Sequence, residues 1–228
     1  MLLNAHGGFW SGGNAVNGND EYTKLLLHFD GADGSTTFTD SSASAHTVTP
    51  FADAQIDTAQ SKFGGSSCVM DGNDYATLVD HADFQFGTGD FTIDFWFRIN
   101  SGTLHYLYDG RPNGSNGLRP TLYYNSGLKY LTNAVDRITG STLSTGVWYH
   151  IALARSGTDT KLFIDGTQTG STYTDSNNYV GGTDRPIIGA SGNPTGGGPL
   201  NGWLDEYRVS KGIARWTSNF TPPTGPYY

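Results

Sequence analysis

Apolar and polar residues alternate along most of this chain with the period of two that is typical of β-strands. The clearest example runs from residue 91 to residue 99. One face carries only bulky apolar side chains: Phe91, Ile93, Phe95, Phe97 and Ile99. The other face carries Thr92, Asp94, Trp96 and Arg98. Burial of each large apolar side chain stabilises a fold by about 2 kcal/mol, so this segment is predicted to be a central core strand.

Roughly a dozen short segments of this kind, separated by turn residues, are predicted as strands of a two-sheet antiparallel β-sandwich. No segment shows a sustained helical period. The other predicted strands are Leu25–Phe29, Thr36–Thr39, Ser66–Met70, Tyr75–Val79, Leu104–Tyr108, Arg119–Tyr124, Leu128–Leu131, Val147–Leu153, Lys161–Ile164, Thr169–Tyr173, Pro186–Gly189 and Gly202–Ser210. Asp165-Gly166 predicts a type I′ hairpin turn. We therefore expect one all-β domain over residues 24–228.

The last of these strands has an unusual composition. Strict alternation would place Leu204, Glu206 and Arg208 on one face and Trp203, Asp205, Tyr207 and Val209 on the other. Carboxylates are rarely buried without a partner. A metal ion, backbone donors, or the nearby Arg208 and Arg215 would each explain Asp205 and Glu206, and these alternatives remain open at this stage.

Residues 1–23 lack hydrophobic periodicity and are punctuated by glycine pairs. They predict an irregular arm with one aromatic anchor, Phe9-Trp10. The arm is either a frayed terminus or a segment that docks onto another chain, because an exposed Phe-Trp pair favours a partner surface. The start of the chain has no cationic segment followed by an apolar run, so no secretory signal is expected.

Composition narrows the classes of partner. The chain has 228 residues, 32 of them glycine, and a net charge of −8 with scattered cations. Nucleic acid and anionic membranes are therefore poor partners. No apolar run is long enough to span a membrane. The single cysteine, Cys68, lies in an apolar strand and is expected to be a buried core thiol.

The outer face of the 91–99 strand carries the best candidates for sugar binding. Sugar rings stack on flat aromatic side chains while their hydroxyl groups seek carboxylates and guanidinium groups. Asp94, Trp96 and Arg98 provide this combination, and Tyr106 with Tyr108, and Tyr123 with Tyr124, extend it. The alternative is that these aromatic side chains fill a covered face of the sandwich or an interface in a homo-oligomer.

No catalytic residue is predicted. Nucleophile elbows and phosphate-binding loops are missing, and the six histidines show no pair at the sequence spacing of a metal site. His150 is expected to be a hydrogen-bonded structural histidine.

Seven stretches, in order, resemble the concanavalin A-like lectin/glucanase superfamily, and specifically its laminin G-like jelly roll. They are Leu25–Gly31, Asp40–Ser42, Lys62–Ser67, Gly89–Trp96, Trp148–Ala152, Leu162–Gly166 and Leu204–Val209. The resemblance implies two curved antiparallel sheets with the first and last strands paired. It also implies glycan binding, often with a structural calcium ion.

Pairing of the first and last strands would bring Asp30 close to Asp205, which makes them the candidate calcium ligands, with further oxygens from the Asp40–Ser42 turn. The glucanase members carry two glutamates around an aspartate on one strand. The matching strand here has Asp94 alone, so the resemblance implies a protein that is not an enzyme.

The opening Leu25–Gly31 and the closing Ala214–Pro223 resemble the variant found in structural proteins of tailed phages. The sequence therefore predicts a virion surface protein, made in the host cytoplasm, that decorates a capsid or tail. Its partners would be other virion proteins, bound through the arm, and surface glycans. A free-standing lectin is the alternative, and a glycan-cleaving enzyme with an unrecognised site is a third.

Overall fold

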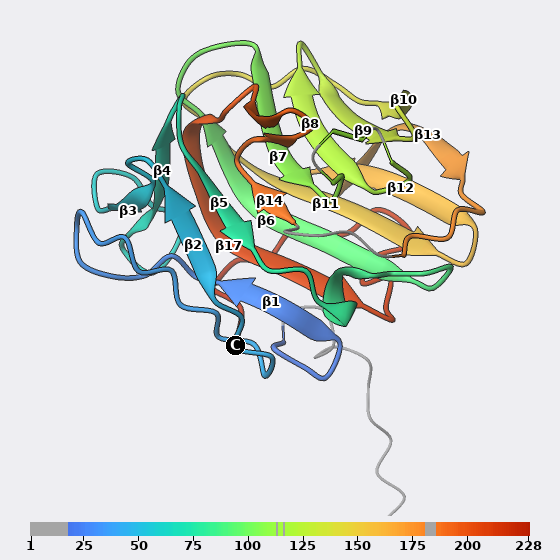
Figure 1. Cartoon of the computed structure of the whole chain (residues 1–228), viewed down its shortest axis with the longest axis horizontal. Helices are drawn as coiled ribbons and strands as arrows, with labels where there is room; N and C mark the ends of the chain where they lie inside the picture. The colour runs from blue at the N-terminus through green and yellow to red at the C-terminus, as the bar shows by residue number, and fades with distance from the viewer. Residues whose placement is uncertain (1–17, 113, 116, 181–185) are drawn as a thin grey trace, which may run out of the picture.

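A computed structural model describes residues 18–112, 114–115, 117–180 and 186–228, and it shows two large antiparallel sheets packed face to face (Figure 1). The eight-stranded sheet contains β1 (Thr23–Leu27), β3 (Gln55–Asp57), β4 (Ser67–Asp71), β6 (Phe91–Ile99), β11 (Trp148–Ser156), β12 (Asp159–Ile164), β13 (Thr167–Thr174) and β17 (Asn201–Lys211). The seven-stranded sheet contains β2 (Val48–Phe51), β5 (Tyr75–Leu78), β7 (Leu104–Asp109), β8 (Thr121–Asn125), β9 (Leu128–Thr132), β10 (Val135–Thr139) and β14 (Ile187–Ile188). The predicted all-β sandwich is confirmed.

Two small elements complete the fold. Strands β15 (Ser191–Gly192) and β16 (Thr195–Gly197) pair with each other outside the large sheets. A single 3-10 turn, η1 (Ala82–Phe84), is the only helical element among the described residues. No helix in these ranges has the length and apolar character that a membrane crossing requires.

Strand β17 lies in the middle of the eight-stranded sheet. Its eleven residues pair with different strands along their length. One edge of β17 pairs with β6. On the other edge, residues 201–204 pair with β4 and residues 207–210 pair with β1. The expected pairing of the first and last strands is therefore confirmed, and β17 is paired along both of its edges. The described N-terminal residues also reach the C-terminus, since the backbone N–H of Asn19 donates to the carbonyl of Tyr228 at 2.6 Å.

The predicted division of the two faces of β17 is wrong beyond residue 205, because the strand contains a β-bulge. The register with β6 shifts between Asp205 and Arg208, and Glu206 adopts a left-handed conformation with φ 49°. The bulge adds one residue to the strand, so every residue after it changes face. Leu204, Tyr207 and Val209 consequently point into the core, where Tyr207 stacks on Phe95 at 4.7 Å. Asp205 and Arg208 point outward with Trp203.

The sandwich core forms where the sequence predicts it. The five apolar residues on the inner face of β6 are at most 1% exposed and belong to the main hydrophobic cluster between the sheets. The Asp165-Gly166 turn has positive φ at both residues, 48° and 73°, as a type I′ turn requires. Cys68 is buried, as expected.

One predicted strand is wrong. Residues 36–39 lie outside any strand, although Phe38 is buried and packs edge-on against Phe29 with ring centroids 5.3 Å apart. An aromatic side chain there fills the core without a backbone ladder, so alternation alone gave a false strand.

The C-terminal segment, defined here as residues 212–228, covers part of the outer face of the eight-stranded sheet. Trp216 and Phe220 stack on each other at 4.1 Å and pack against Ala152, Ala154 and Phe163. The docking residues predicted in the arm, Phe9 and Trp10, lie outside the described residues.

Candidate functional site

The five residues predicted to bind glycans do not form one surface. Asp94, Trp96 and Arg98 lie on the outer face of β6, as predicted, but Tyr106 and Tyr108 belong to β7 in the other sheet. Tyr108 is 1% exposed and is part of the core between the sheets. Tyr106 is partly exposed on the opposite side of the sandwich, where it stacks on Tyr123 at 5.1 Å.

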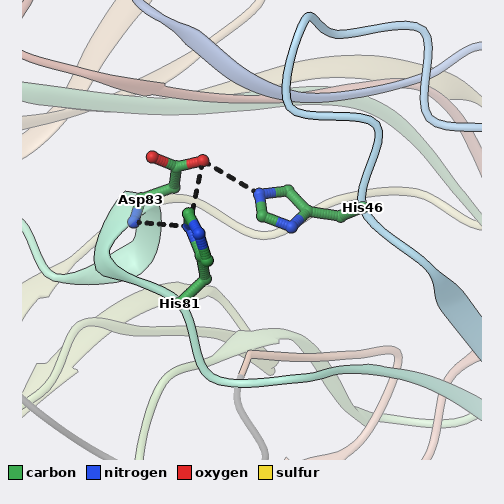
Figure 2. Close-up of side chains that lie close together, drawn as sticks. All are labelled: His46, His81 and Asp83. Carbon is green, nitrogen blue, oxygen red and sulfur yellow. Dashed lines mark hydrogen bonds and ion pairs between the residues drawn. The ribbon is translucent and has the colours of Figure 1, made fainter.

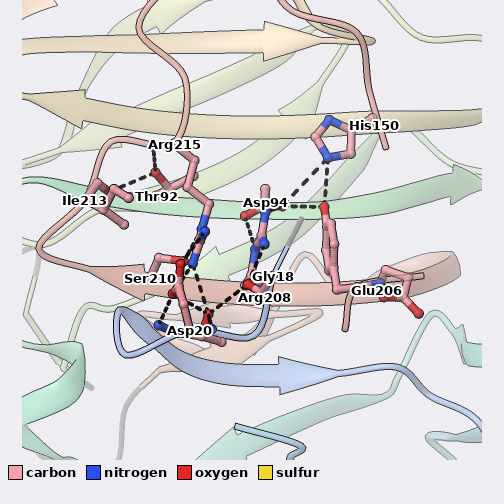
Figure 3. A network of polar contacts seen from close by, with 12 residues as sticks. Gly18, Asp20, Thr92, Asp94, His150, Glu206, Arg208, Ser210, Ile213 and Arg215 are labelled. Carbon is pink, nitrogen blue, oxygen red and sulfur yellow. Dashed lines mark hydrogen bonds and ion pairs between the residues drawn. The ribbon is translucent and has the colours of Figure 1, made fainter. Parts of the chain in front are cut away.

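Asp94 is the centre of a buried polar network beneath the C-terminal segment (Figure 3). The guanidinium group of Arg208 donates to both of its carboxylate oxygens, at 3.1 and 3.0 Å. The phenol of Tyr227 also donates to Asp94, and the same hydroxyl lies 3.1 Å from Nε2 of His150. The ring of Tyr227 lies over the Arg208 guanidinium at 3.9 Å.

This environment makes Asp94 a structural anion. Burial alone would raise the pKa of its carboxyl group, but the charge of Arg208 and hydrogen bonds from His150 and Arg208 outweigh that effect and hold the pKa well below its usual range. The pKa of His150 is lowered, mainly by burial. The prediction that His150 is a hydrogen-bonded structural histidine is confirmed, whereas Asp94 is wrong as part of an accessible glycan surface, because the C-terminal segment covers it.

Trp96, two residues along β6, is covered by a different segment. The Lys62 ammonium lies 3.8 Å from the centre of its ring, and Phe63 meets the ring edge-on at 5.8 Å. The indole is 5% exposed, and its Nε1 atom is buried without a hydrogen-bond partner. The ring is therefore closed to a ligand unless Lys62 moves aside.

Beyond Trp96 the same face is open and carries a row of partly exposed side chains across three adjacent strands. Trp148 on β11 is the register partner of Arg98 on β6, and Arg98 is in turn the partner of Trp203 on β17. All three residues are partly exposed. The Arg98 guanidinium lies 4.8 Å from the Trp203 ring, and the Trp203 indole N–H donates to Asp57 at 2.6 Å. We call these three residues the Trp–Arg–Trp row.

The Trp–Arg–Trp row has the chemistry that sequence reasoning sought around Asp94. Two indole rings flank a cationic donor, and the hydrogen bond to Asp57 fixes one indole on a rigid sheet. The row retains Arg98 from the predicted set and adds Trp148 and Trp203, which sequence reasoning missed as ligand contacts. Both tryptophans occupy outward positions of their strands, but only the strand register shows that they flank Arg98.

A separate cleft of about 220 Å³ opens at the edge formed by β11, β12 and β13. Tyr149, Leu143 and Ile164 provide its apolar lining, and its polar lining consists of Ser141, Thr142, Thr167, Gln168 and Thr169. A hollow that combines one aromatic ring with several hydroxyl groups is a second place where a sugar could lie.

Asp205, one of the two candidate calcium ligands, has one satisfied and one unsatisfied oxygen. Its Oδ2 accepts the backbone N–H groups of Lys62 and Phe63 at 2.7 and 3.1 Å. Its Oδ1 is buried and has no hydrogen-bond partner. Burial raises the pKa of Asp205 to about 7, against the opposing effect of the two backbone donors. A buried carboxylate oxygen without a donor fits a cation ligand.

Asp30, the second candidate, is exposed and approaches the same loop. A Cβ atom added at Gly64 would lie 1.9 Å from its Oδ1, so only glycine permits this contact. Both carboxylates therefore meet the Lys62–Ser66 loop, and the donor set fits calcium in that respect. The Asp40 carboxylate accepts backbone N–H groups from Leu26, Ser42 and His46. The contribution of oxygens from the Asp40–Ser42 turn stays a prediction.

For Glu206, the structure decides between the three partners left open by the sequence: a metal ion, backbone donors, or Arg208 and Arg215. Glu206 lies 2.9 Å from Nδ1 of His28 and accepts the backbone N–H of Tyr227 at 2.7 Å. The two arginines have other partners: Arg208 pairs with Asp94, and Arg215 pairs with Asp20. One backbone donor and a histidine therefore satisfy Glu206.

A family model described as the concanavalin A-like lectin/glucanases superfamily matches residues 70–215. No curated protein sequence matches the chain.

Solved structures of low sequence identity share the fold. The binding domain of Paraclostridial Mosquitocidal Protein 1 superposes with a TM-score of 0.62 at 16% identity, covering 86% of this chain and 50% of that one. Domain 4 of AbnA, a GH43 extracellular arabinanase from Geobacillus stearothermophilus in complex with arabinotriose, gives a TM-score of 0.61 at 16% identity, covering 84% of this chain and 93% of that domain. The binding domain of Botulinum Neurotoxin DC in complex with SialylT gives 0.58 at 12% identity, covering 86% and 49%.

Proposed function

Because the chain belongs to the concanavalin A-like lectin/glucanase superfamily, we propose that it is a glycan-binding, lectin-like module whose ligand lies on the Trp–Arg–Trp row. The observation that carries the proposal is the register that aligns Trp148, Arg98 and Trp203 on one open face. Two of the similar structures support it at the level of fold, since the arabinanase domain is in complex with arabinotriose and the neurotoxin binding domain is in complex with SialylT.

The row sits on rigid strands, so binding would need little rearrangement of the protein. Indole rings offer flat apolar faces to the C–H groups of a sugar ring, and Arg98 offers several N–H donors to hydroxyl or carboxylate groups. The charge of Arg98 favours a sugar that carries a carboxylate, although the chain as a whole has a net charge of −8. A neutral sugar rich in hydroxyl groups is the alternative, because Asp57 could accept hydrogen bonds from those groups as well.

A glycan array tests the proposal, followed by titration of the best ligand against single variants. Trp148→Ala, Trp203→Ala and Arg98→Ala are each expected to weaken binding by about tenfold or more, because anchors of this kind dominate binding energy. Phe51→Ala is the matched control, since Phe51 is 53% exposed on the other sheet. Silence across the array would overturn the proposal. Loss of binding in Gln168→Ala alone would move the ligand to the cleft lined by Tyr149.

For the biological setting, we propose a virion surface protein in which residues 1–23 dock onto another particle protein. The support is the resemblance of Leu25–Gly31 and Ala214–Pro223 to phage structural proteins. The variant Phe9→Ala with Trp10→Ala should then lose incorporation into particles while its melting temperature stays unchanged. Normal incorporation after deletion of residues 1–17 would contradict a docking role and leave the glycan-binding proposal intact.

We also propose that calcium binds at Asp205, with Asp30 as the second carboxylate. The ion would supply positive charge to the unpartnered Oδ1 of Asp205 and stabilise the Lys62–Ser66 loop. A chelator should lower the melting temperature of the wild-type protein. Asp205→Asn should melt at one temperature with and without chelator, and an unchanged wild-type melt in chelator would contradict the proposal.

A further inference from the structure

Two histidines and an aspartate from connections far apart in the sequence meet at the surface of the sandwich (Figure 2). His46 lies in the connection between β1 and β2, whereas His81 and Asp83 belong to η1 and the residue before it. The sequence showed no histidine pair at metal spacing, because residues 46 and 81 are neighbours only after folding. Among the described residues, this is the one group of three or more histidine, cysteine or acidic side chains with ligand atoms within 4.8 Å of one another.

The distances within the cluster are close to those between ligands of one metal ion. Nε2 of His46 lies 3.0 Å from Oδ2 of Asp83, and Nδ1 of His81 lies 3.2 Å from the same oxygen. Two donor atoms bound to one tetrahedral zinc ion at about 2.0–2.1 Å are separated by about 3.3–3.4 Å. The side chains therefore need only small shifts to converge on a common ion.

One contact in the cluster is electrostatically mismatched. Nδ1 of His81 accepts the backbone N–H of Asp83 at 3.2 Å, which requires a free lone pair on that nitrogen. The same nitrogen faces the Asp83 carboxylate oxygen at 3.2 Å, where a lone pair is repelled. Protonation of Nδ1 would satisfy the carboxylate but oppose the backbone donor. A cation bound to both the nitrogen and the oxygen would replace this repulsion by two attractive contacts, in exchange for the hydrogen bond from the Asp83 backbone.

The surrounding residues hold the ligands in place. Asp40 accepts the backbone N–H of His46 at 2.7 Å, which fixes the loop that carries this histidine to β1. The hydroxyl of Ser44 donates to Oδ2 of Asp83 at 2.7 Å. Supporting hydrogen bonds of this kind orient metal ligands.

We propose that His46, His81 and Asp83 form a binding site for a divalent transition-metal ion of the zinc class. Two imidazole nitrogens and one carboxylate oxygen suit Zn²⁺ or Co²⁺, whereas Ca²⁺ and Mg²⁺ prefer oxygen ligands alone. Water completes the coordination, because His81 is exposed. The bound ion would tie the β1–β2 connection to the β5–β6 connection, and this site is independent of the glycan and calcium sites proposed above.

Direct metal titration of the full chain, with any affinity tag removed and chelator dialysed away, tests this proposal. The wild-type protein is expected to bind one Zn²⁺ per chain in competition with a chromogenic chelator. Co²⁺ is expected to give the visible absorption bands of nitrogen-ligated cobalt. His46→Gln, His81→Gln and Asp83→Asn should each weaken Zn²⁺ binding by at least about tenfold.

Asp80→Asn is the matched control, because it removes the same charge as Asp83→Asn from a residue next to His81 that is outside the cluster. It should bind Zn²⁺ as the wild-type protein does. Zinc should also raise the melting temperature of the wild-type and Asp80→Asn proteins but not that of His46→Gln. The circular dichroism spectrum of each variant in chelator establishes that it is folded. Absence of saturable zinc binding to the wild-type protein, or binding unchanged in His46→Gln, would overturn the proposal.

Discussion

The outer face formed by β11, β6 and β17 has two ends that are built from similar residues. One end is buried and the other is partly exposed. At one end Asp94 pairs with Arg208 in register, and the C-terminal segment seals them from water. At the other end Arg98 lies between Trp148 and Trp203, and these side chains remain partly exposed. A charged group and flat aromatic rings are present at both ends. What covers the sheet decides which end stabilises the fold and which end is available to a ligand.

The comparison can be tested first at its buried end. Asp94→Ala leaves the Arg208 guanidinium buried without its carboxylate, so we expect the free energy of unfolding to fall by about 3–5 kcal/mol. Urea denaturation measures the change. Asp33→Ala, at an exposed aspartate that hydrogen-bonds Thr58, is the control and should cost under about 1 kcal/mol. Equal losses in the two variants would refute a structural role for the Asp94 network.

The pH dependence of stability tests Asp205, which lies between the two ends. Its pKa is raised from 3.8 to about 7 in the folded protein. The folded state therefore holds a proton that the unfolded state releases between these pH values, and stability must fall as pH rises through this window. The contribution is up to about 1.4 kcal/mol for each pH unit. Unfolding in chelator from pH 4 to pH 8 should show this decline in the wild-type protein, and Asp205→Asn should lack it. Parallel profiles would contradict the assignment.

A smaller loss is expected from the residue that connects the C-terminal segment to the network. Tyr227→Phe removes the hydroxyl that donates to Asp94 and contacts His150, so we expect a cost of about 1.5–3 kcal/mol, the range for a hydrogen bond to a charged group. Tyr228→Phe is the matched control, since that side chain is 77% exposed. Thermal unfolding that shifts equally for both variants would show that the hydroxyl contributes nothing specific.

The smallest effect on stability is expected at the open end. Trp148→Ala should lower the free energy of unfolding by less than about 1.5 kcal/mol, because a partly exposed ring loses little burial on truncation. The same change should abolish most glycan binding. A loss of stability as large as that of Asp94→Ala would mean that the Trp–Arg–Trp row is part of the structural framework, and the distinction between the two ends would fail.

The sequence by itself determined the fold class, the central strand Phe91–Ile99, the Asp165-Gly166 turn and the pairing of the first and last strands. Alternation and turn chemistry are local properties of the sequence. The family is recognised from the order of short motifs along the chain. None of these features requires knowledge of contacts between distant residues. The sequence also predicted that Asp30 and Asp205 lie close together, and both carboxylates meet the Lys62–Ser66 loop. Ligand binding by Arg98 and by these two carboxylates stays a prediction.

The tertiary structure decided what surrounds each of these residues. The bulge at Glu206 reverses the faces of β17 beyond it, which places Arg208 against Asp94 and Tyr207 in the core. The C-terminal segment then buries one end of the outer face, and strand register aligns Trp148 and Trp203 beside Arg98 at the other. The cluster of His46, His81 and Asp83 arises where two loops meet. Each of these features depends on contacts between residues far apart in the chain, which local patterns do not encode.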